Sequence, residues 1–199
     1  MKSVQGDSVR MLPAPVVKGK MSLEEALKSR ESVRDFSSTP LTEKELSQLL
    51  WALQGKTRNW GGRTAPSAGA LYPLEIYVVL PEGVFHYSPQ DHRLARRAAA
   101  DLRNALAAAA LGQACVREAP AVFVIAAVYE RTARKYSNRA ERYVKMEAGH
   151  AGQNLLLQAA ALGLGAVPVG AFHDDQIQRI LALPENHEPL YLIPVGRKR

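Results

Sequence analysis

The 199-residue sequence contains a single cysteine, Cys115, so an intrachain disulfide and a thiolate metal cluster are both excluded. Apolar runs of the roughly 20 residues needed to cross a bilayer are also absent. The first twenty residues lack the continuous apolar core of a secretory signal. These absences favour a protein of the reducing cytoplasm that does not enter the membrane.

Several catalytic signatures are missing as well. The sequence has no H-E-x-x-H, G-x-S-x-G, S-x-x-K or G-x-x-x-x-G-K-[ST] motif, and its five histidines are scattered. Gly163-Leu164-Gly165 begins a dinucleotide-like pattern, but the third glycine is lacking. We therefore expect no metal site, and nothing in the sequence supports a hydrolase triad.

What the chain does contain is an excess of positive charge on an ordinary globular composition. Hydrophobic residues make up 47% of it, and 26 lysines and arginines against 19 acidic residues give a net charge of +7. Such a balance favours anionic ligands, which include nucleic acid, acidic lipid and phosphorylated cofactors. We predict an extended N-terminal arm over residues 1–20 and one domain over residues 21–199.

Hydrophobic periodicity and turn residues predict an α+β fold. Capping-box spacings at Ser22 and Thr42 begin two helices, which should end near Ser29 and Gly55. We expect a hairpin over 75–80 and 84–87, further strands over 121–128 and 190–195, and a short strand or bend over 166–170. Helices are expected over 101–111, 138–162 and 174–181. Helices and strands mix without a regular βαβ rhythm, which favours α+β over a doubly wound sheet.

The connection between the first two predicted helices carries Arg30, Ser32 and Arg34. Guanidinium groups bind phosphate oxygens bidentately and keep their charge, and a serine hydroxyl can donate to a third oxygen. The alternative is a helix end whose cations offset the dipole without any ligand. A second cationic pair, Arg197 and Arg199, ends the chain and would either join the first at a phosphate or form a solubilising tail.

The long loop over residues 55–73 contains a segment rich in small residues, 63–73, just before the first strand of the hairpin. Its backbone could lie flat against a planar ring. The bend over residues 167–171 could present amides to a ligand, although it could also be a plain turn. A phosphate site and a flat ring together suggest a nucleotide-like cofactor.

Two further patterns lie in or near the long predicted helix. Between Arg131 and Lys145 there are six basic residues and one acid, which could bind nucleic acid but more simply form a solvated loop and helix start. Glu147, His150 and Asn154 share one helix face. We expect His150 to be a buried, hydrogen-bonded residue of that face.

Four segments in chain order resemble the flavin-dependent nitroreductase family, most closely its SagB-type branch, which includes dehydrogenases that oxidise azolines to azoles. They are Ser29-Arg30-Glu31-Ser32-Val33-Arg34, then residues 65–73 (APSAGALYP), then Gly149-His150 through Asn154-Leu155, and then residues 163–170 (GLGAVPVG). The resemblance implies a mixed, mainly antiparallel sheet flanked by helices. It also implies an intertwined homodimer with two FMN sites at the subunit interface.

By this resemblance Arg30 and Ser32 would bind the FMN phosphate, helped by Arg197 and Arg199. Arg34 would lie near the pyrimidine edge of the flavin, where a cation stabilises the charge gained on reduction. Glu31 departs from the family, because that position is often basic. An acid there should weaken phosphate binding unless it points away.

The resemblance places the flavin ring between two further segments. Pro66, Ser67, Ala68 and Ala70 of the other subunit would pack on the ring, although Ala68 and Ala70 stand where many members have a serine and an asparagine. The bend that contains Pro168, Val169, Gly170 and Ala171 would offer the amides of its last two residues to the reactive nitrogen.

The predicted activity is ping-pong hydride transfer from NAD(P)H through FMN to a nitro compound, quinone or similar organic acceptor. One alternative is oxidation of azoline-like substrates, for which Lys135 and Tyr136 resemble the lysine-tyrosine pair of the SagB-type branch. The alternative from another class is a non-enzymatic protein that binds nucleic acid through the basic run.

Overall fold

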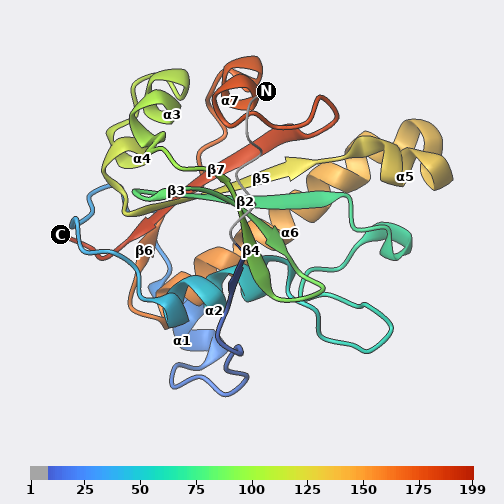
Figure 1. Cartoon of the computed structure of the whole chain (residues 1–199). Helices are drawn as coiled ribbons and strands as arrows, with labels where there is room; N and C mark the ends of the chain where they lie inside the picture. The colour runs from blue at the N-terminus through green and yellow to red at the C-terminus, as the bar shows by residue number, and fades with distance from the viewer. Residues whose placement is uncertain (1–8) are drawn as a thin grey trace.

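The computed structural model describes residues 9–199, which form a seven-stranded sheet in the order β1-β4-β3-β2-β5-β7-β6 (Figure 1). All ladders between these strands are antiparallel. A single parallel bridge joins Ser32 to Ala166 beside the edge strand β6. The strands are β1 (Val9–Met11), β2 (Leu74–Leu80), β3 (Gly83–Ser88), β4 (Arg93–Ala98), β5 (Ala121–Ala127), β6 (Gly165–Ala166) and β7 (Glu188–Gly196).

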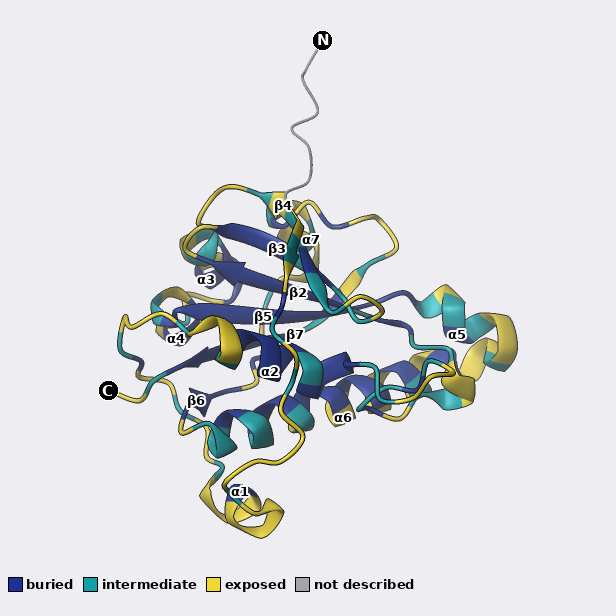
Figure 2. Ribbon diagram, turned by 60° about the horizontal axis from the view of Figure 1, so that its bottom comes forward, coloured by how far each residue is buried: buried dark blue, intermediate teal, exposed yellow. Residues whose placement is uncertain are grey.

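Helices cover both faces of this sheet, as the resemblance stated above implies (Figures 1 and 2). On one face lie α2 (Glu43–Gln54) and the long α6 (Ala140–Ala161), with the short α1 (Leu23–Ser29) beyond them. The other face carries α3 (Arg103–Ala109), α4 (Ala114–Glu118) and α7 (Asp174–Ile180). The helix α5 (Tyr129–Tyr136) contacts α6 and projects beyond the sheet, and short 3₁₀ turns span Ala68–Ala70 and Ser137–Arg139.

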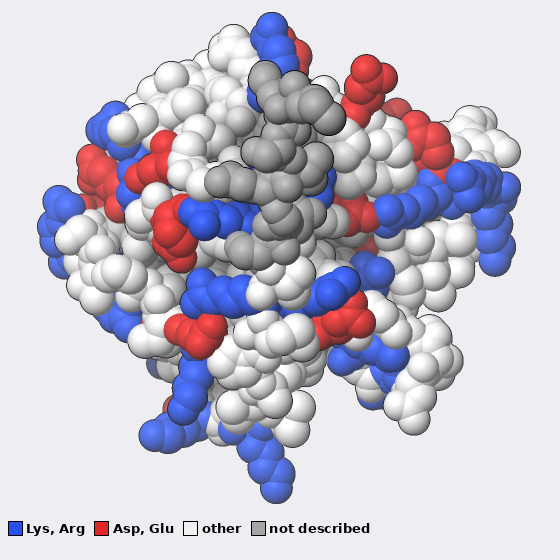
Figure 3. All heavy atoms as spheres, in the orientation of Figure 1, with Lys and Arg blue, Asp and Glu red and all other residues white. Residues whose placement is uncertain are grey.

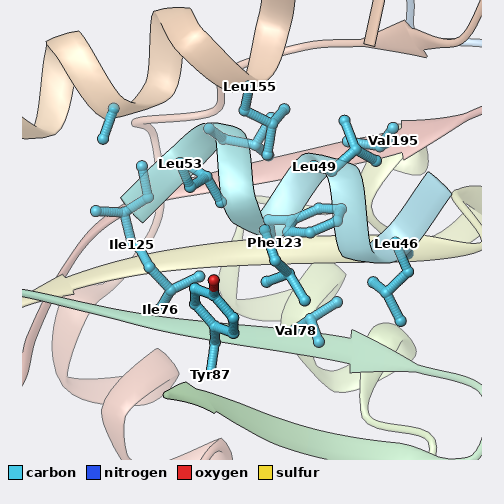
Figure 4. Close-up of a cluster of buried hydrophobic side chains, with 14 of the residues drawn as sticks. Leu46, Leu49, Leu53, Ile76, Val78, Tyr87, Phe123, Ile125, Leu155 and Val195 are labelled. Carbon is cyan, nitrogen blue, oxygen red and sulfur yellow. The ribbon is translucent and has the colours of Figure 1, made fainter. Parts of the chain in front are cut away.

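The apolar strand β5 lies in the middle of the sheet and is buried along its whole length, as predicted. Phe123 and Ile125 face the α2 and α6 layer, together with Leu49 and Leu155 (Figure 4). Val124 points to the α3, α4 and α7 layer. Burial of each such side chain contributes about 1.5–3 kcal/mol to the stability of the fold. Because its side chains alternate between the two faces, β5 contributes to both hydrophobic cores.

Both predicted capping boxes are present. The Ser22 hydroxyl accepts from the amide of Glu25 at 3.1 Å, and the Glu25 carboxylate accepts from the amide of Ser22 at 2.7 Å. Thr42 and Glu45 repeat the arrangement at 3.2 and 2.6 Å. These reciprocal bonds fix the starts of α1 and α2, and hence the connection between them that carries Arg30 and Arg34.

Several elements were not predicted. Strands β1 and β4 pair with each other, helix α4 forms in a stretch for which no element was predicted, and helix α5 forms where a solvated loop was expected. Within the described part of the predicted arm, Leu12 is buried and Val16 donates its amide to the Gln48 side chain at 2.8 Å. The boundary between arm and domain at residue 20 stays a prediction. Among residues 9–199 no helix is long and apolar enough to span a membrane.

Candidate functional site

The connection between α1 and α2 lies along the edge strand β6. Arg30 is the C-cap of α1, Ser32 forms the parallel bridge to Ala166, and the amide of Val33 donates to the Ala166 carbonyl at 3.0 Å. A Cβ on Gly165 would lie 2.7 Å from the Val33 side chain. This close approach therefore requires glycine at position 165, which lies in a motif singled out in the sequence.

The C-terminal segment lies beside the same connection. Phe36 and Lys198 form an antiparallel bridge, and the amide of Ser37 donates to the Arg197 carbonyl at 2.9 Å. The amide of Arg199 donates to the Asp35 carbonyl at 3.3 Å. The structure thus brings together two cationic segments that stand at opposite ends of the sequence.

The side chains of the C-terminal segment already have partners. Arg197 donates to the Glu45 carboxylate at 2.9 and 3.2 Å and to the Pro40 carbonyl at 3.0 Å. Arg199 donates to the Phe36 carbonyl at 2.9 Å and pairs with Asp35 at 3.2 Å. To bind a phosphate, both guanidinium groups would have to exchange these partners.

A cavity of about 310 Å³ separates this cationic edge from α6. The cavity is lined by Arg30, Glu31 and Lys198 and by apolar residues of α6 that include Leu156 and Ala160. Lys198 pairs with Glu31 at 2.6 Å, and this hydrogen bond and charge hold the pKa of Glu31 below its usual value. The predicted acid beside the candidate phosphate site is therefore neutralised by the chain itself.

Arg30, Ser32 and Arg34 differ from the C-terminal arginines in their availability. Ser32 and Arg34 are exposed and Arg30 is half-buried. Within residues 9–199, neither Arg30 nor Arg34 forms an ion pair. These donors can bind an anion without losing an existing partner.

The bend after β6 presents backbone to solvent. Val169 is buried and exchanges two hydrogen bonds with Leu192, at 2.8 and 3.0 Å, whereas Pro168, Gly170 and Ala171 are exposed. The amides of Gly170 and Ala171 donate to no other residue in the described part of the chain. These two adjacent amides are available to donate hydrogen bonds to a ring atom that accepts them.

The predicted ring-packing segment, 66–70, lies on a different part of the molecule. Gly69 and Ala70 have φ angles of 63° and 55°, and Tyr72 follows with 47°. The amide of Tyr72 donates to the Ser67 hydroxyl at 2.9 Å, which closes this tight turn. The turn presents the small residues Pro66, Ala68, Gly69 and Ala70 without a bulky side chain.

The segment 66–70 also meets the end of α5. A Cβ on Gly69 would lie 2.9 Å from the Tyr136 hydroxyl and 3.2 Å from Nζ of Lys135. The lysine-tyrosine pair predicted as a candidate base is thus beside the predicted ring-packing segment of the same chain. In Figures 1 and 2 this group lies near α5, on the side of the molecule opposite the C-terminus and the Arg30 segment.

A polar network supports this second group from below. Arg63 lies over the Tyr72 ring, 4.5 Å from its centroid, and Arg131 donates to the Tyr72 carbonyl at 3.0 Å and also binds Glu75. Glu75 pairs on its other side with His86 at 2.6 Å. Burial raises the pKa of Glu75, but the bonds from His86 and Arg131 outweigh it and hold the pKa at about 2.

The expectation about His150 was wrong. His150 is exposed, and the buried polar residue of α6 is Glu147, whose side chain is only 3% exposed. Burial raises the pKa of Glu147 to about 7, against smaller opposing effects of Ser67, Arg63 and Gln54. Its buried neighbours Val144, Ala148 and Ala151, at helical spacing on the same helix, are the signal in the sequence that could have identified it as buried.

The basic run between Arg131 and Lys145 is distributed over α5 and the start of α6. Figure 3 shows lysine and arginine side chains gathered over α5, with acidic groups among them. Arg131 is bound to Glu75, and Lys145 pairs with Glu141 one turn away. The run is therefore partly neutralised within the chain rather than a continuous basic surface.

Comparison with known proteins assigns the class. The model of the nitroreductase family matches residues 27–197, and the chain belongs to this family of oxidoreductases. A protein of Methanocaldococcus jannaschii that is assigned as a nitroreductase is 50% identical over 184 residues, which cover 89% of this chain and 92% of that protein. The crystal structure of an assigned nitroreductase from Ralstonia eutropha has a TM-score of 0.88 and 36% identity, over 96% of this chain and 90% of that one.

Two more distant relatives carry more specific names. An NADPH-flavin oxidoreductase of Vibrio harveyi is 25% identical over 86% of this chain and 64% of its own length. The trifolitoxin operon protein TfxC of Rhizobium leguminosarum is 25% identical over 86% of this chain and 54% of its own length. The similarity thus extends to proteins that carry different names.

Proposed function

We propose that this protein is an FMN-dependent oxidoreductase that transfers hydride between NAD(P)H and an organic acceptor, such as a nitro compound or a quinone, by a ping-pong mechanism. Membership of the nitroreductase family and the relationship to an NADPH-flavin oxidoreductase support the flavin and the donor. The observation that carries the proposal is that the Arg30 segment and the 66–70 segment, the two segments suited to a flavin, lie on opposite sides of the molecule.

The first half-site fits the phosphate and the polar edge of a flavin. Arg30, Ser32 and Arg34 offer two fixed positive charges and a hydroxyl that are free of acidic partners within residues 9–199. A phosphate ester carries about −1.5 to −2 charge at neutral pH, which two guanidinium groups match. The unpaired amides of Gly170 and Ala171 would face the ring nitrogens from the same half.

The second half-site fits the flat face of a ring. Pro66, Ser67, Ala68 and Ala70 present a narrow turn that a planar group can approach closely. FMN held there would supply the chemistry of hydride transfer between the reduced nicotinamide and the acceptor. The residues of the chain bind and orient the flavin and limit the access of water to it.

The separation of the two half-sites supports a homodimer. Because the Arg30 segment and the 66–70 segment lie on opposite sides of one chain, a single copy cannot enclose one ring with both. A second copy would supply the missing half, which gives two equivalent sites at a symmetric interface. We therefore propose that FMN binds between two copies of this chain.

The proposal is tested first by purification. We expect a yellow protein whose denaturation releases a flavin that carries phosphate, and a mass in solution of twice the 21.8 kDa chain. Steady-state rates measured without oxygen, with NADH or NADPH varied at several concentrations of a nitroaromatic or quinone acceptor, should give parallel lines in double-reciprocal plots. A colourless protein that fails to take up added FMN would contradict the proposal.

A second candidate activity is the oxidation of azoline-like substrates. It is favoured by the position of Lys135 and Tyr136 beside Gly69 and by the relationship to a trifolitoxin operon protein. For this reaction the substrate would give hydride to the oxidised flavin while a base, Lys135 or Tyr136, removes a proton. Incubation with azoline-containing peptides, followed by mass spectrometry for a loss of two hydrogens, tests it directly.

A further inference from the structure

Glu147 lies under the 66–70 segment, in the middle of α6, with its side chain 3% exposed. Three polar side chains from other elements act on it: Gln54 at the end of α2, and Arg63 and Ser67 from the loop. Oε1 of Glu147 and Nε2 of Gln54 are both buried, and neither has a hydrogen-bond partner among residues 9–199. A carboxyl group is thus enclosed below the loop and only partly bonded.

A buried carboxyl group without full hydrogen bonding is costly for the fold. A glutamine at position 147 would occupy nearly the same volume without a charge to bury. The sequence nevertheless has a glutamate there, on the same buried side of α6 as the small apolar residues Ala148 and Ala151 and under a loop that the proposed function uses. This combination indicates a role beyond packing.

We propose that Glu147 is a positioning residue for the flavin site: its carboxylate holds Ser67 and Arg63, and so fixes the 66–70 turn in the shape that packs against the ring. This inference rests on the proposed function, because the turn is taken as the surface that contacts the flavin. Glu147 itself would touch neither the flavin nor the substrate.

The hydrogen bonds of the loop support this role. The Ser67 oxygen already accepts from the Tyr72 amide at 2.9 Å, so its own hydrogen remains available to an acceptor. Arg63 donates to Oε1 of Gln54 at 2.9 Å, and its amide donates to the Tyr72 hydroxyl at 3.2 Å. Hydrogen bonds thus join Arg63 and Tyr72, the two ends of the 63–72 segment, close to Gln54 and Ser67. The Glu147 carboxyl group lies next to these side chains.

The state of the carboxyl group determines how strongly it can hold the loop. An ionised Glu147 accepts from Ser67 with both oxygens available and attracts the Arg63 guanidinium, whereas a protonated one loses that attraction. The groups that face it are Gln54 from α2 and Ser67 and Arg63 from the loop, and Arg63 in turn feels Glu75, Tyr72 and Arg131. Since the pKa of Glu147 is raised to about 7, the change of state falls near neutrality.

The test compares FMN affinity between about pH 6 and pH 8 for the wild-type protein, Glu147→Gln and Glu141→Gln. At about pH 8 we expect Glu147→Gln to bind FMN about tenfold more weakly than the wild type, the loss of one charge-assisted contact. At about pH 6 the two should agree. Titration of the FMN phosphate cancels in this ratio, and Glu141, exposed on the same helix and paired with Lys145, is the matched control that should follow the wild type.

A second readout does not depend on the flavin. Amide hydrogen exchange of residues 63–72 in the FMN-free protein should slow in the wild type relative to Glu147→Gln as the pH rises through 7. The variant Ser67→Ala leaves the core untouched. In the Ser67→Ala background, the wild-type Glu147 and Glu147→Gln should give the same exchange of residues 63–72. Ser67→Ala replaces Glu147→Gln if Glu147→Gln fails to fold.

The outcomes separate the two proposals. If FMN binds and the ratio of affinities is the same at both pH values, the positioning role is wrong although the flavin site stands. If FMN does not bind to the wild type, the proposed function fails, and the exchange measurement still decides whether Glu147 holds the loop. Equal exchange of 63–72 in the wild type and Glu147→Gln across this range would overturn the inference.

Discussion

Lys198 and Glu31 form an ion pair with 2.6 Å between Nζ and Oε1, which joins the C-terminal segment to the connection between α1 and α2. Both residues border the cavity that Arg30 also lines. Glu31 therefore neutralises a cation at the position where the family resemblance suggests a phosphate. The pair also holds the two segments next to each other.

Replacing this acid should improve binding of an anion. We expect Glu31→Gln to tighten FMN binding about two- to fivefold, because one negative charge is removed and Lys198 is released at an exposed site. The gain should largely disappear at ~1 M salt, where the Debye length is about 3 Å. Fluorescence quenching of FMN measures it, and Glu24→Gln on the exposed first turn of α1 is the control. Weaker binding in Glu31→Gln would mean that the ion pair shapes the site.

Arg30 and Arg34, which form no ion pair within residues 9–199, should carry most of the phosphate binding. Replacing Arg30 and Arg34 together by alanine should weaken FMN binding at least ~10-fold, since each charge-assisted hydrogen bond contributes about 1.5–3 kcal/mol. Stability to urea should change little, because neither guanidinium forms an ion pair within residues 9–199. Lys28→Ala, in the last turn of the same helix, should retain FMN as the wild type does. Unchanged retention in the double variant would assign these residues another role.

Arg197 should instead contribute to folding. Its guanidinium links the last strand to Glu45 at the start of α2 and to the Pro40 carbonyl. We expect Arg197→Ala to lower the free energy of unfolding of the FMN-free protein by about 1 kcal/mol, because the pair is only partly shielded from solvent. Arg199→Ala, at a more exposed site, should have a smaller effect in the same urea titration. A variant of unchanged stability that loses FMN would show that Arg197 exchanges Glu45 for phosphate.

The sequence predicted those elements that depend on local chemistry. Capping boxes at Ser22 and Thr42 and the unbroken apolar run of β5 specify their structures through neighbouring residues alone. Strand β4 was missed because its six residues include three arginines and no apolar run. It forms by pairing with β1 and β3. Tertiary pairing of this kind has no signature within six residues.

The candidate site divides in the same way. The sequence indicated that Arg30, Ser32 and Arg34 are suited to an anion, and the fold places them beside the C-terminus. It could not indicate that Arg197 binds Glu45, because a partner 152 residues away is set only by the fold. His150 was expected to be buried, but Glu147 is the buried residue. Both lie near one face of α6, and the elements that pack against the helix decide which residues of that face are buried.

Lys135 and Tyr136 distinguish the two candidate activities. If they act as the base in azoline oxidation, Lys135→Ala and Tyr136→Phe should each reduce that reaction about 100-fold or more, the usual contribution of general acid–base catalysis. Reduction of a nitroaromatic by NAD(P)H should then change less than about twofold, because a hydride transfer of this kind does not use that base. Lys145→Ala, whose side chain is exposed and pairs with Glu141, is the control. Equal losses in both assays would mean that the pair acts through Gly69 on the shape of the loop.

Glu75 and Glu147 should make opposite contributions to stability as the pH changes. The pKa of Glu75 is lowered to about 2, so its contribution is complete above the unfolded value of 4.5 and is lost as the pH falls through 2. The pKa of Glu147 is raised to about 7, so stability is greatest below 4.5 and declines as the pH rises through 7. The two residues thus titrate on opposite sides of their shared unfolded value.

Urea unfolding of the FMN-free protein tests this pair of signs. At about pH 7 we expect Glu75→Gln to be less stable than the wild type by up to about 3 kcal/mol, and the difference should shrink as the pH is lowered towards 2. Glu147→Gln should match the wild type at about pH 4 and exceed it by up to about 3 kcal/mol at about pH 8, because an amide avoids burial of the carboxylate. Glu141→Gln should follow the wild type at each pH, since that carboxylate is exposed. A Glu147→Gln protein less stable than the wild type at about pH 8 would show that the carboxylate gains more from Arg63 and Ser67 than burial costs it.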